Sequence, residues 1–471
     1  MILLITVPRF FLGVCRMNFN IVVSVIASIM ILNCACRQEE IRSDLYISDS
    51  TVSISHQKCI ADTSQSYYLA LPPDFDLLKK YPLIIAFDPQ GNGNLAVRSL
   101  VGAVTNFEYM VAGSNVIRNG YENIENAFTT LINDILNRYP VDINRIYAAG
   151  FSGGGRFAQI LSQMNTNIKA VISIGAGFTF DQSRPLRNKV PMLFLVGDED
   201  FNYLEINNSK ETLKLLGVQY FIFEFKGKHE WPERQIADEA LLWFEFDDCR
   251  RNKTRKNDPV IKKYREVIHE NAARFITDHD MMHATMEYEK GIAFLSGLAN
   301  TSGMVKKMKF CKESPDYKDK FDKMNSALSL ESRLQQGYIS ALNLRDTLWW
   351  RNEVKKLNQQ ITEEDDPYLL SAFKRVKSFL SIAAYSFCNV SLKDNDLSRA
   401  RKLIDIYHIV DPGNPDGYYF SALYYSRSGQ SKIASEFFRK AVDSGFKDFQ
   451  KAMQELPKEV YHFLPRSITQ L

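Results

Sequence analysis

A serine set among glycines, where a strand pattern gives way to a helix pattern, most constrains this chain. Residues 150–154 read Gly-Phe-Ser-Gly-Gly. The β-branched and aromatic run at 144–149 predicts a strand, and 156–161 predict a helix. So sharp a turn strains the serine backbone and leaves no room for a Cβ beside it. The pattern predicts a serine hydroxyl held clear at the end of a strand, before a helix N-terminus that favours negative charge.

Length and composition indicate a folded protein of two or three domains. The chain has 471 residues, too many for one ordinary core. Its hydrophobic content of 45% and charged content of 24% are typical of folded soluble proteins. The net charge of +3 is too small for the basic surface of a nucleic-acid binder, so we expect no nucleic-acid partner.

The first 36 residues have the pattern of a targeting segment, whose true start could be Met17. Residues 21–32 are an almost unbroken apolar run, shorter than the roughly 20 residues of a membrane span. The run is followed by Cys34 and Cys36. Cys36 is the better candidate for a modified cysteine, because the small residue Ala35 precedes it. The segment resembles a bacterial lipoprotein signal. That resemblance implies lipidation of Cys36, a membrane partner and an outer-membrane or cell-surface location in a Gram-negative bacterium. A periplasmic location, a cleaved secretory signal and an anchor helix are the alternatives.

Residues 61–250 alternate strand patterns with helix patterns, after a polar tether at 37–60. The expected strands are apolar on both faces, which favours a parallel sheet covered by helices on both sides. We therefore predict an α/β domain with a doubly wound, mostly parallel sheet. Its strands are expected at 67–71, 83–87, 109–114, 145–149, 169–174, 192–196 and 220–225, with a closing helix at 239–246.

After residue 259 no strand pattern returns. The basic run at 250–259 predicts a solvated linker at the start of a helical region that spans 251–380. Ala400 and Ala434 stand 34 residues apart with apolar residues at matching offsets, so 381–471 resemble tetratricopeptide repeats. Such repeats imply an all-α domain and a surface for a protein partner.

Three side-chain types that support nucleophilic catalysis follow predicted strands. A serine hydroxyl needs a base to take its proton, and the base needs an orienting carboxylate. His229 comes after the last predicted strand, whereas the other histidines precede the sheet or lie in the helical part. Asp198, Glu199 and Asp200 follow the strand at 192–196. Parallel strands end at one edge of a sheet, so we expect Ser152, one of these acids and His229 on a common rim.

Four segments carry a resemblance to a known family: 68–74, 81–85, 141–154 and 227–232. They are similar to α/β-hydrolases of the polyhydroxybutyrate depolymerase, feruloyl esterase and dienelactone hydrolase-like branch. The resemblance implies Ser152 as nucleophile, His229 as base and Asp200 as acid. Asp200 is preferred over Asp198 because the family's carboxylate usually stands three residues after the strand's last glycine, here Gly197.

The oxyanion hole needs two backbone N–H groups. The residue after the nucleophile, Gly153, is expected to supply one, and Gln90 or a neighbour in the loop after residue 87 the other. The chain departs from the resembled family here, because Asp88-Pro89 stands where that branch commonly has His-Gly. A carboxylate at this place would oppose an oxyanion unless it turns away.

No metal or cofactor is expected. His279 and His283 have the i, i+4 spacing of zinc proteases, but Asp280 stands where those have Glu, and no third ligand is evident. A solvated helix face is the interpretation we prefer. The remaining cysteines lack metal spacing, and both buried thiols and disulfides stay open: Cys59, Cys249, Cys311 and Cys388.

These patterns together predict an exported serine hydrolase that cleaves an ester through an acyl-enzyme. Polymer-linked and glycan-linked esters are among the candidate substrates. The alternative is a tetratricopeptide interaction lipoprotein whose hydrolase fold is weakly active or inactive. A peptidase would share the same three side chains.

Overall fold

The computed structural model describes residues 52–180, 186, 188–253 and 258–464. The targeting segment, Met17 and Cys36 therefore lie outside the described residues. Within the described part, no helix is long and apolar enough to cross a membrane.

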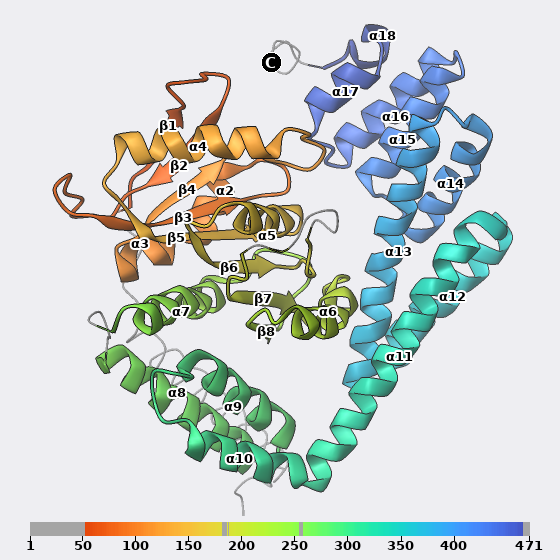
Figure 1. Cartoon of the computed structure of the whole chain (residues 1–471). Coiled ribbons are helices and arrows are strands. Elements are labelled where there is room, and N and C mark those ends of the chain that lie inside the picture. The colour runs from red at the N-terminus through yellow and green to blue at the C-terminus, as the bar shows by residue number, and fades with distance from the viewer. Residues whose placement is uncertain (1–51, 181–185, 187, 254–257, 465–471) are drawn as a thin grey trace, which may run out of the picture. The chain divides into compact units, whose positions relative to one another are not determined.

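An eight-stranded sheet forms the first part of the structure (Figure 1). Its strand order is β1-β2-β4-β3-β5-β6-β7-β8. Strand β2 runs antiparallel to both of its neighbours, β1 and β4. The strands β4, β3, β5, β6, β7 and β8, in their order across the sheet, pair in parallel. The strands are β1 (Ile54–Lys58), β2 (Ser66–Ala70), β3 (Tyr81–Phe87), β4 (Met110–Ser114), β5 (Val141–Phe151), β6 (Ile168–Ile174), β7 (Met192–Gly197) and β8 (Tyr220–Phe225). This is the α/β-hydrolase topology, so the expected mostly parallel, doubly wound sheet is confirmed.

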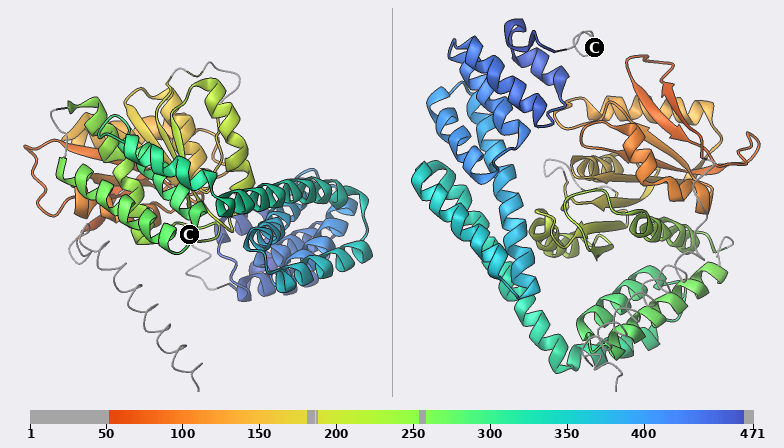
Figure 2. Two further views of the ribbon diagram at one scale, coloured as in Figure 1. Left: turned by 90° about the horizontal axis from the view of Figure 1, so that it is seen from below. Right: turned by 180° about the vertical axis from the view of Figure 1, so that it is seen from behind.

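Helices cover both faces of the sheet, as Figure 1 and the reverse view in Figure 2 show. Side chains alternate between the faces. In β3, Ile84 belongs to the hydrophobic core that includes residues of α2, α3 and α7, while the next residue, Ile85, belongs to the core on the other face, which includes residues of α4, α5 and α6. This two-sided burial explains why β3 is apolar throughout. The helices are α2 (Gly93–Ser99), α3 (Val101–Phe107), α4 (Ile124–Arg138), α5 (Gly153–Met164), α6 (Tyr203–Leu216) and α7 (Arg234–Arg251).

The sheet begins before the expected boundary at residue 61. Strand β1, at positions assigned to the tether, pairs with β2 from Ile54↔Ala70 to Lys58↔Ser66. It is an edge strand with one neighbour and only partly buried side chains, and its sequence therefore lacks a clear apolar alternation.

The expected solvated linker is wrong at its first two residues. Arg250 and Arg251 belong to α7, which is longer than the helix expected at 239–246. Arg250 donates to the carbonyls of Phe294 at 2.7 Å and Ser296 at 2.9 Å. Positive charge in the last turn of a helix interacts well with its dipole, and here it also satisfies carbonyl groups of a neighbouring helix.

In the described residues after α7, helices joined by short connections are present and no strand occurs. The expected boundary between residues 380 and 381 falls inside one continuous helix, α13. Asp366 caps this helix, Pro367 occupies its first turn, and no glycine or further proline interrupts it before residue 394. The helices are α8 (Asp258–Thr277), α9 (Met281–Leu295), α10 (Ser302–Glu313), α11 (Pro315–Leu344), α12 (Thr347–Glu363), α13 (Pro367–Lys393), α14 (Leu397–Val410), α15 (Pro415–Arg427), α16 (Ser431–Asp443), α17 (Phe449–Glu455) and α18 (Lys458–Tyr461).

Helices α11 to α18 enclose a hydrophobic core of their own. Ala400 and Ala434, the pair that suggested the repeat, are both fully buried, in α14 and α16. The tetratricopeptide assignment itself stays a prediction. The cysteines at 59, 249, 311 and 388 are buried, free thiols.

Candidate active site

Ser152 lies on a strained turn between β5 and α5. Its φ of 52° and ψ of −120° are unusual for a residue with a side chain. The Ser152 N–H donates to the Ile174 carbonyl at 2.7 Å. A Cβ on Gly150 would stand 2.3 Å from the Gly154 carbonyl oxygen, so the turn closes only with glycine there. The sharp turn expected from the sequence is present.

The structure brings Ser152, His229 and Asp200 into one hydrogen-bonded series. His229 Nε2 lies 2.9 Å from Ser152 Oγ, and His229 Nδ1 lies 2.9 Å from Asp200 Oδ1. Asp200 is only 1% exposed, and its Oδ1 also accepts the Asn202 N–H at 2.8 Å. In this arrangement a carboxylate holds the imidazole, and the imidazole can take the serine proton.

The two other acids of the loop after β7 have different partners. Asp198 Oδ1 accepts the Gly227 N–H at 3.0 Å, which ties the loop after β7 to the loop after β8. Glu199 Oε1 pairs with Lys374 Nζ at 2.6 Å. Of the three candidates, Asp200 is the acid that the structure places against His229.

Aromatic rings surround the imidazole. The ring centroid of His229 lies 4.1 Å from that of Phe201 and 4.7 Å from that of Phe151. Trp231 packs on Phe151 at 5.7 Å. Apolar rings exclude water and strengthen the hydrogen bonds beside them. These rings were not predicted as part of the site, although each is one or two residues from a predicted site residue.

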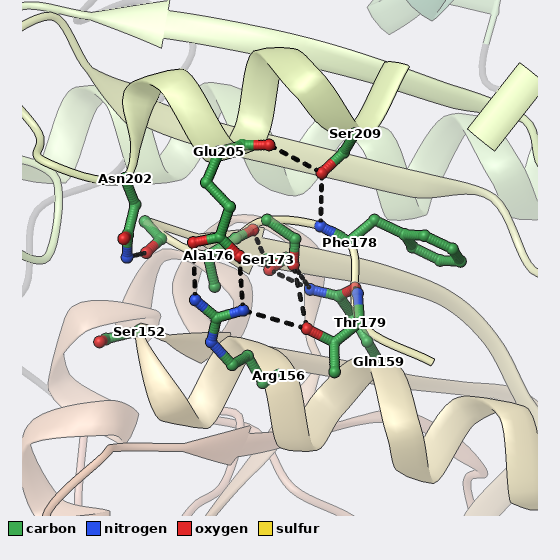
Figure 3. A network of polar contacts seen from close by, with 12 residues as sticks. Ser152, Arg156, Gln159, Ser173, Ala176, Phe178, Thr179, Asn202, Glu205 and Ser209 are labelled. Carbon is green, nitrogen blue, oxygen red and sulfur yellow. Dashed lines mark hydrogen bonds and ion pairs between the residues drawn. The ribbon is translucent and has the colours of Figure 1, made fainter. Parts of the chain in front are cut away.

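A polar network fixes the helix that begins after Ser152 (Figure 3). Arg156 Nη1 and Nη2 donate to the two carboxylate oxygens of Glu205 at 2.7 and 2.8 Å, joining α5 to α6. Gln159 is fully buried and donates to Ser173 Oγ at 2.8 Å and to the Gly177 carbonyl at 3.0 Å. A bidentate pair of this kind sets orientation as well as energy, so it holds the serine turn against the elements around the acid loop.

The two expected oxyanion donors differ in their surroundings. Gly153 is the first residue of α5, where an N–H has no partner within the helix, and Asn119 Oδ1 lies 1.9 Å from where a Cβ on Gly153 would stand. The Gln90 N–H instead donates to Asp88 Oδ1 at 2.9 Å. Gln90 can serve as a donor only once this bond opens, so its role stays a prediction.

Asp88 itself is buried, with 4% exposure. Its Oδ2 accepts from the indole Nε1 of Trp231 at 3.3 Å. Asp88, which with Pro89 replaces the His-Gly of the resembled family, thus accepts hydrogen bonds from its own loop after β3 and from the loop after β8.

His279 and His283 do not share a helix face, contrary to the expectation. His279 has a φ of 57° and precedes α9, whereas His283 lies in its first turn. His283 Nδ1 lies 2.6 Å from Oδ2 of Asp280, the residue that caps α9. Among the described residues, no group of three or more His, Cys, Asp or Glu could hold a metal ion.

No protein-family model and no curated protein matches this sequence. Several solved structures are similar over part of the chain. A ferulic acid esterase is 17% identical, with 41% of this chain and 96% of that one covered and a TM-score of 0.33. The S-formylglutathione hydrolase of Staphylococcus aureus is 13% identical, with 42% and 99% covered and a TM-score of 0.35. A feruloyl esterase module from Clostridium thermocellum is 14% identical, with 42% and 89% covered and a TM-score of 0.35. The fold assignment above follows from the strand order and the turn at Ser152.

Proposed function

We propose that the protein is a serine hydrolase that cleaves an ester through a covalent acyl-enzyme. The observation that carries the proposal is the series from Ser152 Oγ through His229 to Asp200 Oδ1, with both contacts at 2.9 Å. Ser152 stands on a strained turn, and buried Asp200 has the place of an orienting carboxylate.

The mechanism follows from these contacts. His229 Nε2 takes the proton of Ser152 as Oγ attacks the ester carbonyl carbon, and Asp200 stabilises the imidazolium that forms. The Gly153 N–H, at the start of α5, is the donor proposed for the oxyanion. His229 then gives its proton to the departing alcohol. A water molecule, activated by the same imidazole, releases the acid from Ser152.

A weakly active hydrolase fold is the second candidate, and one observation favours it. The Gln90 N–H is bonded to Asp88 Oδ1 instead of being directed at a substrate. Loss of one oxyanion donor typically costs about 2.7–4 kcal/mol of transition-state stabilisation, a factor of 10² to 10³ in kcat. An enzyme in which this bond persists would be slow but still acylated.

Export and partners belong to the proposal as well. The proposed enzyme is attached to a membrane through lipid on Cys36, and helices α14 to α16 offer a surface to a protein partner. The supports are the sequence pattern around Cys36 and the 34-residue spacing of Ala400 and Ala434.

A fluorophosphonate probe tests the central claim, because it reacts with an activated serine. We expect the wild type to be labelled and Ser152→Ala to lose all labelling. Ser340→Ala, a change at an exposed serine on α11, should keep it. A wild-type protein that is folded by circular dichroism and stays unlabelled would contradict the proposal.

A further inference from the structure

Helix α13 contacts the loop that carries the proposed catalytic acid. Arg375 Nη1 donates to the Asp198 carbonyl at 2.6 Å, and Lys374 Nζ pairs with Glu199 at 2.6 Å. The Arg375 guanidinium also lies 4.3 Å from the centroid of the Tyr203 ring, at the start of α6. The two residues before Asp200 and the residue three positions after it thus contact a helix some 175 residues further along the chain.

Arg375 is itself held firmly. Its Nε and Nη2 both donate to Glu331 Oε2 of α11, at 2.9 and 2.6 Å. The side chains of Arg375 and Glu331 are 6% and 0% exposed. Removal of either side chain would leave the other as an uncompensated buried charge, which is strongly destabilising. The guanidinium that donates to the acid loop is therefore held in place by α11.

The next turns of α13 line a cleft beside His229. This cleft has a volume of about 280 Å³, with Phe201 and His229 on the sheet side and Ser378, Ser381 and Ile382 on α13. Residues 375, 378 and 382 recur at helical spacing, so the face of α13 that binds the acid loop continues into the cleft wall. Ile382 is 44% exposed, which leaves it free to contact a bound molecule.

The position of this cleft indicates which part of an ester it receives. In the proposed mechanism His229 Nε2 returns the Ser152 proton to the leaving oxygen, so the alcohol part of the substrate must lie next to the imidazole. We propose that α13 forms a wall of the alcohol-binding part of the cleft and that Ile382 limits the size of the alcohol. This inference rests on the proposed function.

The wall that α13 is proposed to form contacts the substrate's alcohol part, which is present during acylation and absent during deacylation. During acylation the bond between Ser152 Oγ and the acyl carbon forms, and the bond from that carbon to the alcohol oxygen breaks. The proton passes from Oγ through His229 to the alcohol, which departs. Water then attacks an acyl-enzyme that holds no alcohol. A change at Ile382 should therefore alter acylation and leave deacylation as it was.

Two series of esters test this in the full chain: acetates of alcohols from ethanol to naphthol, and ethyl esters of acids from acetate to octanoate. Ile382→Ala should raise kcat/KM for naphthyl acetate relative to ethyl acetate about tenfold, and Ile382→Trp should lower that ratio about tenfold. The acyl-length series and the deacylation rate of the acetyl-enzyme should not change. Val390→Trp is the matched control, because Val390 is 48% exposed on the same helix and does not line the cleft.

The outcomes separate the two proposals. A wild type labelled at Ser152, with Ile382 variants that change neither series or both series alike, would overturn the role of α13 and keep the hydrolase. A wild type that is never labelled would remove the proposed function, and the inference about α13 with it.

Discussion

The serine turn and the loop after β3 lie at the ends of neighbouring strands, yet their polar groups are used in opposite ways. Phe87 of β3 pairs with Gly150 of β5, so the two loops begin side by side. The Ser152 hydroxyl is bonded to a base that can take its proton. The Gln90 N–H is bonded to Asp88 within its own loop. One rim of the sheet therefore carries a turn prepared for attack and a loop whose donor is already occupied.

The two loops are also in direct contact. A Cβ on Gly154 would stand 2.1 Å from the Phe87 carbonyl oxygen, far inside contact distance. The start of α5 therefore lies close against the end of β3. The two loops differ in their hydrogen bonds.

The largest effect should come from a change to the residues that are hydrogen-bonded in series with Ser152. Asp200→Asn should lower kcat by roughly 10⁴-fold, because an amide no longer fixes the imidazole tautomer or stabilises its charge. Steady-state kinetics on an activated acetate ester would measure it. Asp198→Asn is the control, since an amide oxygen can still accept from Gly227, and it should cost little. A larger loss in Asp198→Asn would assign the acid to that residue instead.

An intermediate effect should follow from disturbing the contact between the loops. Gly154→Ala should lower kcat about 10²-fold, because its Cβ forces the serine turn and the Phe87 carbonyl apart by a large part of an ångström. Overpacking should also cost about 1–3 kcal/mol in the free energy of unfolding, which a denaturant titration would record. Gly303→Ala is the matched change, as a Cβ there meets nothing within 4 Å. Equal activity of the two variants would mean that the loops move independently.

The smallest effect should come from a change in the loop after β3, and it should be an increase in the acylation rate. Asp88→Asn removes a negative charge from the loop of the proposed oxyanion donor Gln90 and keeps one oxygen to accept from the Gln90 N–H, while the hydrogen bond from Trp231 Nε1 is lost. We expect acylation to become about tenfold faster, equivalent to about 1.4 kcal/mol, which rapid-quench measurement of the burst would detect. Asp142→Asn, at a partly buried pair with Arg145 near the start of β5, should leave the rate unchanged. Slower acylation in Asp88→Asn would show that the carboxylate supports the site, and the contrast between the loops would fail.

The parts of the fold and of the site that were predicted from the sequence are those that depend on local sequence patterns. The strands β3 to β8 are apolar runs bounded by turns, and the serine turn is a contiguous motif. The choice of Asp200 over Asp198 came from the spacing usual in the resembled family, applied to one short loop. Each of these depends on residues that are close together in the chain.

The parts that were missed depend on contacts between distant residues. Trp231 and Asp88 are 143 residues apart, and nothing near either residue indicates that they bond. Arg375 meets the Asp198 carbonyl across 177 residues, and its position in α13 reads as an ordinary charged position of a long helix. Strand β1 was missed because an edge strand needs little apolar character, and α13 was divided because a repeat boundary was placed where its backbone has no break.

The buried pair of Arg375 and Glu331 has a consequence for how this chain unfolds. Separation of α13 from α11 breaks two hydrogen bonds between Arg375 and Glu331, and separation of α13 from the acid loop breaks those to Asp198 and Glu199. Opening at this point breaks several contacts at once and should cost more than fraying at a helix end. The acid loop and α13 should exchange their amide hydrogens together, as one cooperative unit, although they belong to opposite halves of the sequence.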